Sequence, residues 1–398
     1  MNERVLIVDD NDINRKLLNA TLVKAGHLVA EAADGEQALE MAFQFMPDLI
    51  LLDVMMPKMD GFETCRVLKE DHRTRDIPVI FLSAKSGAED KIRGLDVGGV
   101  DYITKPFDRG EVLARVRNQL KIRTLMQQIL RANEELTEKQ KRLDEDLKAA
   151  AGIQESLLPR RGPGVKNIEF AWRYEACDEI GGDIFNIVRV DEDNLGIYML
   201  DVSGHGVPSA LVTVSVHQSL SPQSGFVAKR RLIVPPYYEV VPPGEVLRLL
   251  DHEYPVERFD KFFTIVYLLL DFKTGLLRYS NAAHPYPFLI RADGSLEVLD
   301  KGGTIIGLDR PVAFEEEEKR LFPGDKVVLF TDGVVECEND RGEFFGEDRL
   351  RSLLVKQKHE PIGTILDGII TALTTFTKSG RPQDDISLLG FGFHEWRG

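Results

Sequence analysis

The sequence predicts a multidomain protein with an α/β doubly wound domain, a helical coiled-coil linker and an α+β domain with a β-sandwich core. The first third alternates short apolar runs with helical periodicity. The middle nearly lacks Gly and Pro, and the last part combines many short strands with separate helices. A length of 398 residues is too great for one ordinary core. We expect the chain to divide into 1–122, 123–160 and 161–398.

The composition describes a soluble globular protein, with 43% hydrophobic residues, 29% charged residues and a net charge of −15. This acidic excess makes nucleic acid a poor partner. No apolar stretch approaches the roughly 18–20 residues that cross a bilayer, and the N-terminus becomes charged too early for a signal peptide. Cys65, Cys177 and Cys337 are too widely spaced for a zinc-ligand pattern. We therefore expect a cytoplasmic protein without a membrane partner.

The first domain has apolar runs at 4–8, 48–53 and 77–83, which are typical of buried parallel strands. Helical periodicity occupies the segments near and between them, at 13–25, 35–46, 60–70 and 88–97. In a doubly wound sheet, ligands bind beyond the carboxyl ends of the strands. Acidic residues lie at these ends, so we expect the site of this domain there.

The residues at these strand ends suit phosphorylation of an aspartate. That chemistry needs an exposed nucleophilic carboxylate, a divalent cation, and a lysine and a hydroxyl for the phosphoryl oxygens. Asp9 and Asp10 follow the first run and Asp53 ends the next, while Ser83 and Lys105 come later in the chain. A cluster of carboxylate oxygens is a suitable site for Mg²⁺.

These motifs resemble the CheY-like receiver domain of bacterial two-component response regulators. The matching segments are Val-Asp-Asp (8–10), Leu-Asp-Val-Met-Met-Pro (52–57), Leu-Ser-Ala (82–84) and Thr-Lys-Pro-Phe (104–107). The resemblance implies that Asp53 is the phosphoacceptor. It also implies that Asp10, Asp53 and the Met55 carbonyl bind Mg²⁺ with help from Asp9, and that the phosphoryl group is bound by Ser83 and Lys105.

The same resemblance implies a histidine kinase as phosphodonor and a cis peptide bond between Lys105 and Pro106. Tyr102 fits the mobile aromatic switch of such domains, and the alternative is a packing residue. The change at Asp53 would then pass to the rest of the chain through the following helix.

From Glu111 to Leu158 the sequence favours one long helix, which Pro159 ends. Apolar residues recur seven apart, at Ile122, Ile129, Leu136, Leu143, Ala150 and Leu157. Such a seam suits a parallel coiled coil and predicts a homodimer, although Lys139 and Asp146 interrupt it. The alternative is a single solvated helix packed on one neighbour.

In the last domain, alternating runs predict strands at 168–174, 184–190, 195–201, 264–271, 276–281, 286–291, 326–331 and 386–393. Helical patterns lie at 207–219, 243–254, 347–357 and 362–376. Segment 219–243, with its two Pro-Pro pairs, predicts a loop or flap. Its basic run Lys229-Arg230-Arg231 could recruit a phosphorylated substrate or simply be solvated.

A second acidic constellation is spread through this domain. Its members are Asp183 after two glycines, Asp201 and Asp332 at strand ends, and the pair Asp384-Asp385 before the last strand. Carboxylates on converging strand ends, backed by glycines, can hold two divalent cations, which activate water and neutralise phosphate charge. Such a site needs no cysteine or serine nucleophile.

These motifs resemble the SpoIIE/RsbU branch of the metal-dependent PPM protein serine/threonine phosphatases, supported by Ile153-Gln154, Leu157-Leu158-Pro159 and Asn281-Ala282-Ala283-His284. The resemblance implies that Asp201 bridges two Mn²⁺ or Mg²⁺ ions. Asp183 and the Val202 carbonyl would complete one site. Asp332 and one member of the 384–385 pair would complete the other, with Asp384 favoured as ligand and Asp385 as support.

The chain departs from this family at Asn186, where relatives often have Asp, and at Ala283, where the usual residue is Gly. Neither change removes a core ligand. We expect His205 to shape its loop. His284 is expected to be structural, because carboxylates already complete the ligand set.

Together the two resemblances imply a response regulator that controls a phosphatase. The substrate would be a phosphoserine or phosphothreonine on an anti-sigma-factor antagonist of the STAS type. The alternative is a non-catalytic adaptor, in which the receiver gates a protein-binding surface on a degenerate phosphatase fold. Against that alternative, buried carboxylates without a metal are costly.

Overall fold

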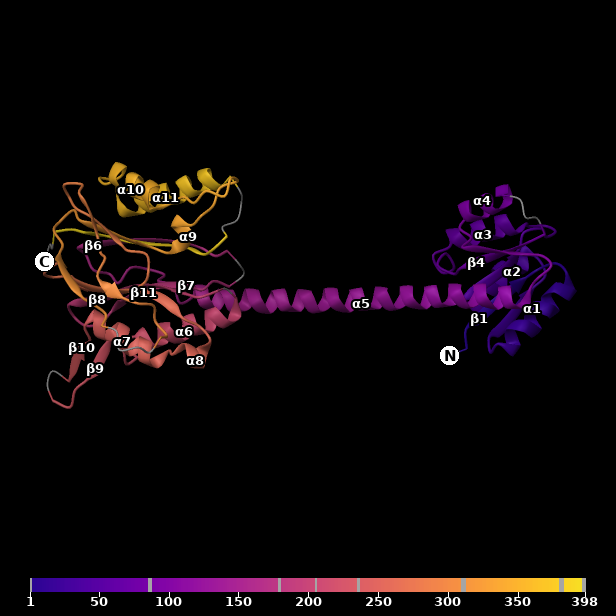
Figure 1. The fold of residues 1–398 in the computed structure, drawn as a ribbon, viewed down its shortest axis with the longest axis horizontal. Helices are drawn as coiled ribbons and strands as arrows, with labels where there is room; N and C mark the ends of the chain where they lie inside the picture. The colour runs from indigo at the N-terminus through magenta and orange to yellow at the C-terminus, as the bar shows by residue number, and fades with distance from the viewer. Residues whose placement is uncertain are drawn as a thin grey trace. The chain divides into compact units, whose positions relative to one another are not determined.

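The computed structural model describes residues 2–84, 88–177, 180–204, 206–234, 237–308, 313–378 and 383–395. His205 lies outside these residues. The chain forms two compact units, Met1–Gln140 and Lys141–Gly398 (Figure 1). Each unit is described below by itself.

The first unit has one parallel five-stranded sheet of order β2-β1-β3-β4-β5. Its strands are β1 Arg4–Val8, β2 Leu28–Ala32, β3 Leu49–Asp53, β4 Val79–Ser83 and β5 Asp101–Thr104. Its helices are α1 Asp12–Lys24, α2 Gly35–Phe45, α3 Gly61–Glu70 and α4 Ala88–Asp96, followed by α5 Arg109–Glu155. The α/β doubly wound prediction is confirmed.

The order of this sheet brings three strand ends to one edge. β3 and β4 are buried along their whole length, with hydrophobic clusters on both faces of the sheet. Parallel pairing aligns Val8 with Leu52, Asp53 with Leu82, and Ser83 with Thr104. The residues that follow β1, end β3 and β4, and follow β5 therefore meet at the same edge of the sheet.

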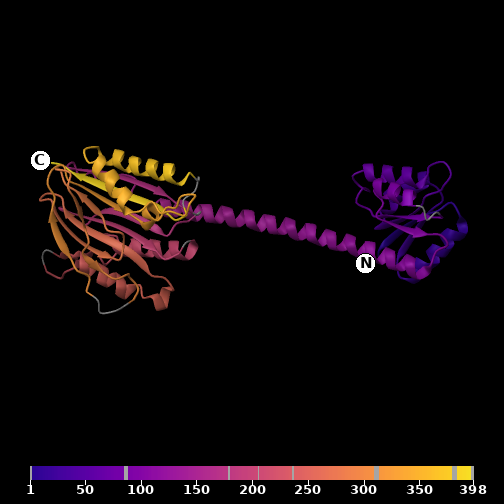
Figure 2. The same cartoon turned by 45° about the horizontal axis from the view of Figure 1, so that its top comes forward.

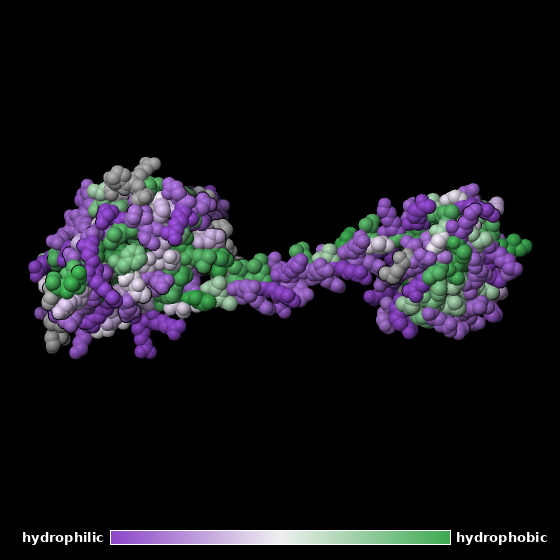
Figure 3. Space-filling model, turned by 90° about the horizontal axis from the view of Figure 1, so that it is seen from below, coloured by the Kyte–Doolittle hydropathy of each residue, from purple (hydrophilic) through white to green (hydrophobic). Residues whose placement is uncertain are grey.

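Helix α5 is continuous over 47 residues, which confirms the predicted long helix. The apolar residues Ile122, Ile129, Leu136 and Leu143 are each more than half exposed in the single chain. Figure 3 shows hydrophobic side chains on the surface along this helix. No helix in the described part of the chain is long and apolar enough to span a membrane.

The second unit is a sandwich of two sheets, as predicted, with helices on both outer faces (Figure 2). One sheet has the order β15-β12-β11-β8-β7 with β16 beside β12, and the other has the order β14-β13-β17-β18-β6. The core between the sheets is apolar. Helices α6 and α7 pack on the first sheet, and α10 and α11 on the second.

The strands of this unit are β6 Ile168–Glu175, β7 Asp183–Arg189, β8 Asn194–Val202, β9 Lys229–Arg231, β10 Tyr238–Val240, β11 Phe263–Asp271, β12 Leu276–Ala282, β13 Phe288–Ile290, β14 Leu296–Val298, β15 Gly302–Gly303, β16 Glu317–Arg320, β17 Lys326–Phe330 and β18 Ile386–Phe393. The helices are α6 Val207–Leu220, α7 Pro243–Glu253, α8 Val256–Phe259, α9 Asp332–Val335, α10 Glu347–Lys356 and α11 Ile362–Thr377.

The predicted loop or flap over 219–243 contains a short hairpin. Strands β9 and β10 pair as an antiparallel hairpin within it. Both strands are three residues long, too short for an alternating pattern to reveal them.

Candidate functional site

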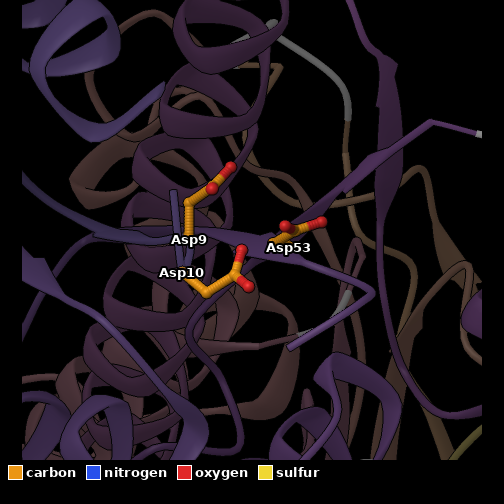
Figure 4. Close-up of side chains that lie close together, drawn as sticks. All are labelled: Asp9, Asp10 and Asp53. Carbon is orange, nitrogen blue, oxygen red and sulfur yellow. The ribbon is translucent and has the colours of Figure 1, made fainter. Parts of the chain in front are cut away.

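Three carboxylates meet at the edge of the parallel sheet in the first unit. Asp9, Asp10 and Asp53 offer oxygens that all lie within 4.8 Å of one another (Figure 4). Asp9 and Asp53 are buried and Asp10 is exposed. The Lys105 Nζ atom lies 2.6 Å from Asp53 Oδ2 and 2.8 Å from Asp9 Oδ2. The predicted cluster is therefore assembled, with the Lys105 ammonium group against two of its carboxylates.

Burial dominates the electrostatics of this cluster. It raises the pKa of the Asp53 carboxyl, while the hydrogen bond from Lys105 opposes the rise. Burial also lowers the pKa of Lys105, but the hydrogen bonds to Asp53 and Asp9 outweigh it, so this pKa lies above its ordinary value. The donor set of three carboxylates, paired with Lys105 alone among the lysines that the structure describes, fits a hard divalent cation.

The other residues predicted for this site lie on, or just after, strands β3, β4 and β5. The Met55 N–H donates to Asp53 Oδ1 at 3.4 Å, so the Met55 backbone lies beside the acceptor carboxylate. Ser83 is buried at the end of β4. The Tyr102 ring is buried and stacks on Phe81 at 5.3 Å, so this tyrosine packs inward in the present structure. The Lys105–Pro106 peptide bond is cis, as predicted.

In the second unit, the inner rows of the sandwich change from apolar to polar at one end. Side chains that alternate along a strand share a face, so a row continues at every second residue. The polar residues occupy the last positions of rows that belong to the inter-sheet core. Each lies two residues from an apolar residue of its own strand, and the pairs are Asp183 with Phe185, Asp201 with Met199, Thr264 with Val266, and Ser387 with Leu389. The site thus lies between the sheets, where the core ends.

Strand register brings the first two aspartates together. Asp201 is directly opposite Asp183 on β7 and opposite Thr264 on β11. The Ser387 hydroxyl donates to Asp183 Oδ2 at 2.7 Å. Sequence reasoning missed Ser387, although a serine at an inward position of an otherwise apolar strand was a usable signal.

Glycines allow the closest approaches in this site. A Cβ atom at Gly182 would lie 2.9 Å from the Val202 carbonyl oxygen and 3.5 Å from Asp201 Oδ1, so both oxygens gather around this glycine. A Cβ atom at Gly333, next to Asp332, would collide with the Asp385 carbonyl. Glycine at these positions lets the acidic segments pack together.

The two neighbouring aspartates of the last loop differ in environment. Asp385 is buried, and its carboxylate accepts hydrogen bonds from the N–H groups of Gly182 at 2.7 Å and Cys177 at 2.9 Å. Asp384 is exposed, and its Oδ1 accepts the N–H of Asp385 at 2.8 Å. Asp385 therefore holds the glycine loop, while the Asp384 carboxylate lies at the surface of the site.

The acidic groups raise one another's pKa. The pKa of Asp201 rises to about 7, first through burial and then through the charges of Asp332 and Asp384. Burial, followed by the Asp201 charge, places the pKa of Asp183 well above its ordinary value. Burial also raises the pKa of Asp332, with Asp384 contributing. Among the described residues, no basic side chain forms an ion pair with Asp183, Asp201 or Asp332.

A partly buried group of carboxylates with no basic ion-pair partner among the described residues fits divalent cations as counterions. The oxygens of these aspartates do not, however, come within 4.8 Å of one another as a group of three. Within the described ranges, only the receiver cluster does so. The structure thus brings the five aspartates into one neighbourhood without closing them into a tight cage.

Two side chains from helices hold the glycine loop beside Asp183. Gln154, in the last turn of α5, is buried and donates from Nε2 to the Gly181 carbonyl at 2.8 Å. The Thr213 hydroxyl on α6 donates to the Gly182 carbonyl at 2.8 Å. Thr213 was missed in the sequence, because an isolated threonine within a helix carries no such signal.

The basic run 229–231 lies on the β9–β10 hairpin, away from the acidic site. The Lys229 Nζ atom donates to the Val190 carbonyl, just beyond the end of β7 opposite to Asp183. Arg230 forms ion pairs with Glu239 and Glu245. Much of the charge of this run is therefore used within the fold.

Family models match both units. The response regulator receiver domain matches residues 5–117, and the model of stage II sporulation protein E (SpoIIE) matches residues 191–394. The transcriptional regulator RpaA of Synechocystis is 49% identical over 118 residues, which cover 30% of this chain and 49% of RpaA. The response regulator PleD of Caulobacter vibrioides is 46% identical over 129 residues, covering 32% of this chain and 28% of PleD. The chain thus spans half or less of these relatives.

Among solved structures, the SiaA-PP2C domain of Pseudomonas aeruginosa superposes with a TM-score of 0.54 at 21% identity. The match covers 64% of this chain and 98% of that domain, and at this identity it shows the fold alone. Because the SpoIIE model matches more than half of the chain, the protein belongs to the stage II sporulation protein E family and carries a response regulator receiver domain ahead of the family's phosphatase domain.

Proposed function

We propose that the chain is a cytoplasmic two-component response regulator in which phosphorylation of Asp53 controls a metal-dependent protein serine/threonine phosphatase. The observation that carries the proposal is the end of the sandwich core, where Asp183 and Asp201 face each other across β7 and β8 without a basic partner among the described residues. Their position suits binding of divalent cations and a phosphate ester between the sheets.

In the receiver, a histidine kinase would supply the phosphoryl group. The Asp53 carboxylate attacks phosphorus, the bond to the kinase imidazole breaks, and Lys105 balances the added charge from 2.6 Å. Asp9, Asp10, Asp53 and the Met55 carbonyl would hold Mg²⁺, and Ser83 would bind a phosphoryl oxygen.

In the phosphatase domain, Asp201 would bridge two Mn²⁺ or Mg²⁺ ions. Asp183 and the Val202 carbonyl would complete one site, and Asp332 and Asp384 the other. When bound, such ions lower the pKa of a water and neutralise phosphate charge. Asp385 would support the site through the Gly182 N–H, as its burial and hydrogen bonds favour.

Control would reach this site through α5. The Gln154 amide holds the Gly181 carbonyl, two residues before Asp183, so movement of the helix end would displace a carboxylate. The exposed apolar residues along α5 support pairing of two chains through this helix. The protein substrate would be a phosphorylated anti-sigma-factor antagonist of the STAS type.

The test is hydrolysis of a chromogenic aryl phosphate by the full chain, with and without Mn²⁺. Activity that depends on Mn²⁺ and is lost with Asp201→Asn supports the proposal. A comparison of phosphoproteomes between wild-type and Asp201→Asn cells would then reveal the substrate.

The second candidate is the non-catalytic adaptor. It is favoured by one observation, that the phosphatase carboxylates of the described chain do not form a group of three within 4.8 Å. An adaptor would hydrolyse no aryl phosphate at any Mn²⁺ concentration, while still accepting a phosphoryl group on Asp53.

A further inference from the structure

His284 belongs to the second unit and has no role in the ligand set proposed above. Its side chain is buried between the two sheets of the sandwich. Its Nδ1 atom shares a hydrogen bond of 2.8 Å with the Thr264 hydroxyl. Its Nε2 atom is buried and has no hydrogen-bond partner among the described residues, while the ring lies close to the Phe330 backbone. A buried polar atom in this state is costly, so its position calls for a reason.

The backbone around His284 is held to present this side chain. The Asn281 side chain accepts the His284 N–H at 2.7 Å and donates to the His284 carbonyl at 2.9 Å. Between them, Ala283 adopts a left-handed conformation with φ of 53°. This conformation is unfavourable for alanine, so the turn is imposed by its surroundings.

Through Thr264, the imidazole reaches the row of carboxylates. Thr264 is directly opposite Asp201, and Asp201 is opposite Asp183, so the three side chains form one row across β11, β8 and β7. The ring also lies close to the backbone of Phe330, which ends β17 two residues before Asp332. His284 thus lies between the row of Asp183, Asp201 and Thr264 in one sheet and strand β17, which leads to Asp332, in the other.

We infer that His284 is a positioning residue for the carboxylate site: it fixes the row of Asp183 and Asp201, through Thr264, against the strand that leads to Asp332. The inference rests on the proposed metal site. His284 would set the spacing between ligands that come from the two sheets. Its loss therefore affects ion affinity before it affects folding.

The test measures Mn²⁺ binding directly, by the spectroscopic signal of free Mn²⁺, in full chains carrying Asp10→Asn and Asp53→Asn to silence the receiver cluster. His284→Ala and Thr264→Val are each expected to weaken binding about 10- to 100-fold, as losses of residues that orient ligands do. The double variant is expected to bind Mn²⁺ no more weakly than His284→Ala, because the two changes remove the same connection.

His217→Ala is the matched control. Its Nδ1 atom forms the same kind of bond, 2.8 Å to the Tyr198 hydroxyl, and Tyr198 belongs to the core on the face of β8 opposite to Asp201. It should lower the melting temperature without changing the Mn²⁺ dissociation constant. His284→Gln, which keeps a polar group, provides a second variant if His284→Ala fails to fold, and it should recover part of the affinity.

Mn²⁺ affinity within twofold of the parent in His284→Gln and Thr264→Val would overturn this inference alone and leave His284 a packing residue. Equal Mn²⁺ binding by the parent and its Asp201→Asn variant would instead overturn the proposed metal site, and this inference with it.

Discussion

Gln154 donates a hydrogen bond of 2.8 Å from its side-chain amide to the carbonyl oxygen of Gly181. This contact joins the last turn of α5 to the loop that carries Asp183. The other groups of the loop are also held, since Thr213 binds the Gly182 carbonyl and Asp385 binds the Gly182 N–H. Several contacts therefore hold the glycine loop, and one of them comes from the helix that begins in the receiver.

Replacing Gln154 tests this connection. Gln154→Leu leaves the Gly181 carbonyl buried without a partner, at a cost of about 1–3 kcal/mol. We expect lower aryl phosphatase activity, by about tenfold, and a loss of the response to Asp53 phosphorylation. Gln127→Leu, at an exposed position of the same helix, is the control. It should change neither the aryl phosphatase activity nor its response to Asp53 phosphorylation. A normal response in the Gln154 variant would exclude this route.

Replacing Asp201 tests the catalytic proposal. Asp201→Asn removes the carboxylate that faces both Asp183 and the last acidic loop, so hydrolysis should fall by several orders of magnitude. Phosphoryl uptake on Asp53, followed by intact mass, should be unchanged. Asp300→Asn, on the exposed surface, should retain full activity.

Breaking α5 tests its pairing. Leu136→Pro interrupts the helix and its apolar stripe at a cost of about 3 kcal/mol or more. We expect a monomer in sedimentation equilibrium and an aryl phosphatase rate that no longer depends on phosphorylation. If the variant is dimeric and its regulation is intact, the helix does not carry the signal.

The pH dependence of stability reports the carboxylate cluster when ions are removed by chelation. The pKa of folded Asp201 is about 7, above its ordinary value of 3.8. A raised carboxyl pKa gives stability that is present below the ordinary pKa and is lost as the pH rises through the folded value. In EDTA, the melting temperature of the phosphatase domain should fall between about pH 4 and about pH 8. Asp201→Asn should flatten this fall, and a flat wild-type profile would argue against the cluster.

The backbone conformation of Ala283 explains why glycine is the usual residue of the family pattern at this position. Its φ of 53° lies in the left-handed region, where glycine is unstrained. Ala283→Gly should therefore raise the free energy of unfolding by about 0.5–1 kcal/mol, after the added entropy of the unfolded chain is counted. Denaturant unfolding checks this value, and Ala33→Gly, which has no left-handed conformation to relieve, should give no gain.

Much of the architecture could be predicted because burial is visible in sequence. Strands β1, β3 and β4 are continuous apolar runs, whereas β2 carries Glu31 and is half-exposed, and was therefore not recognised. The five aspartates could be placed at strand ends by the same patterns. The sequence favours Asp384 over Asp385 as the ligand but does not decide between them. The choice depends on which carboxylate contacts the glycine loop in the folded chain.

The partners of the polar residues were the least predictable part. Nothing local tells that Gln154 faces a carbonyl 27 residues away, or that Thr264 meets an imidazole 20 residues later. These contacts depend on how separate elements pack, and they involve residue types that are common on any surface.

The inner rows of the sandwich keep hydrophobic residues along most of their length and end in polar side chains, among them Asp183 and Asp201. The fold therefore does not depend on the polar residues of the site, because a single replacement at the last position of a row leaves the hydrophobic interior unchanged. Descendants of one ancestral gene could thus alternate between active enzymes and silent scaffolds by mutation at the rim alone. Resemblance of backbone, however close, does not separate the two, and only the identities of these terminal positions do.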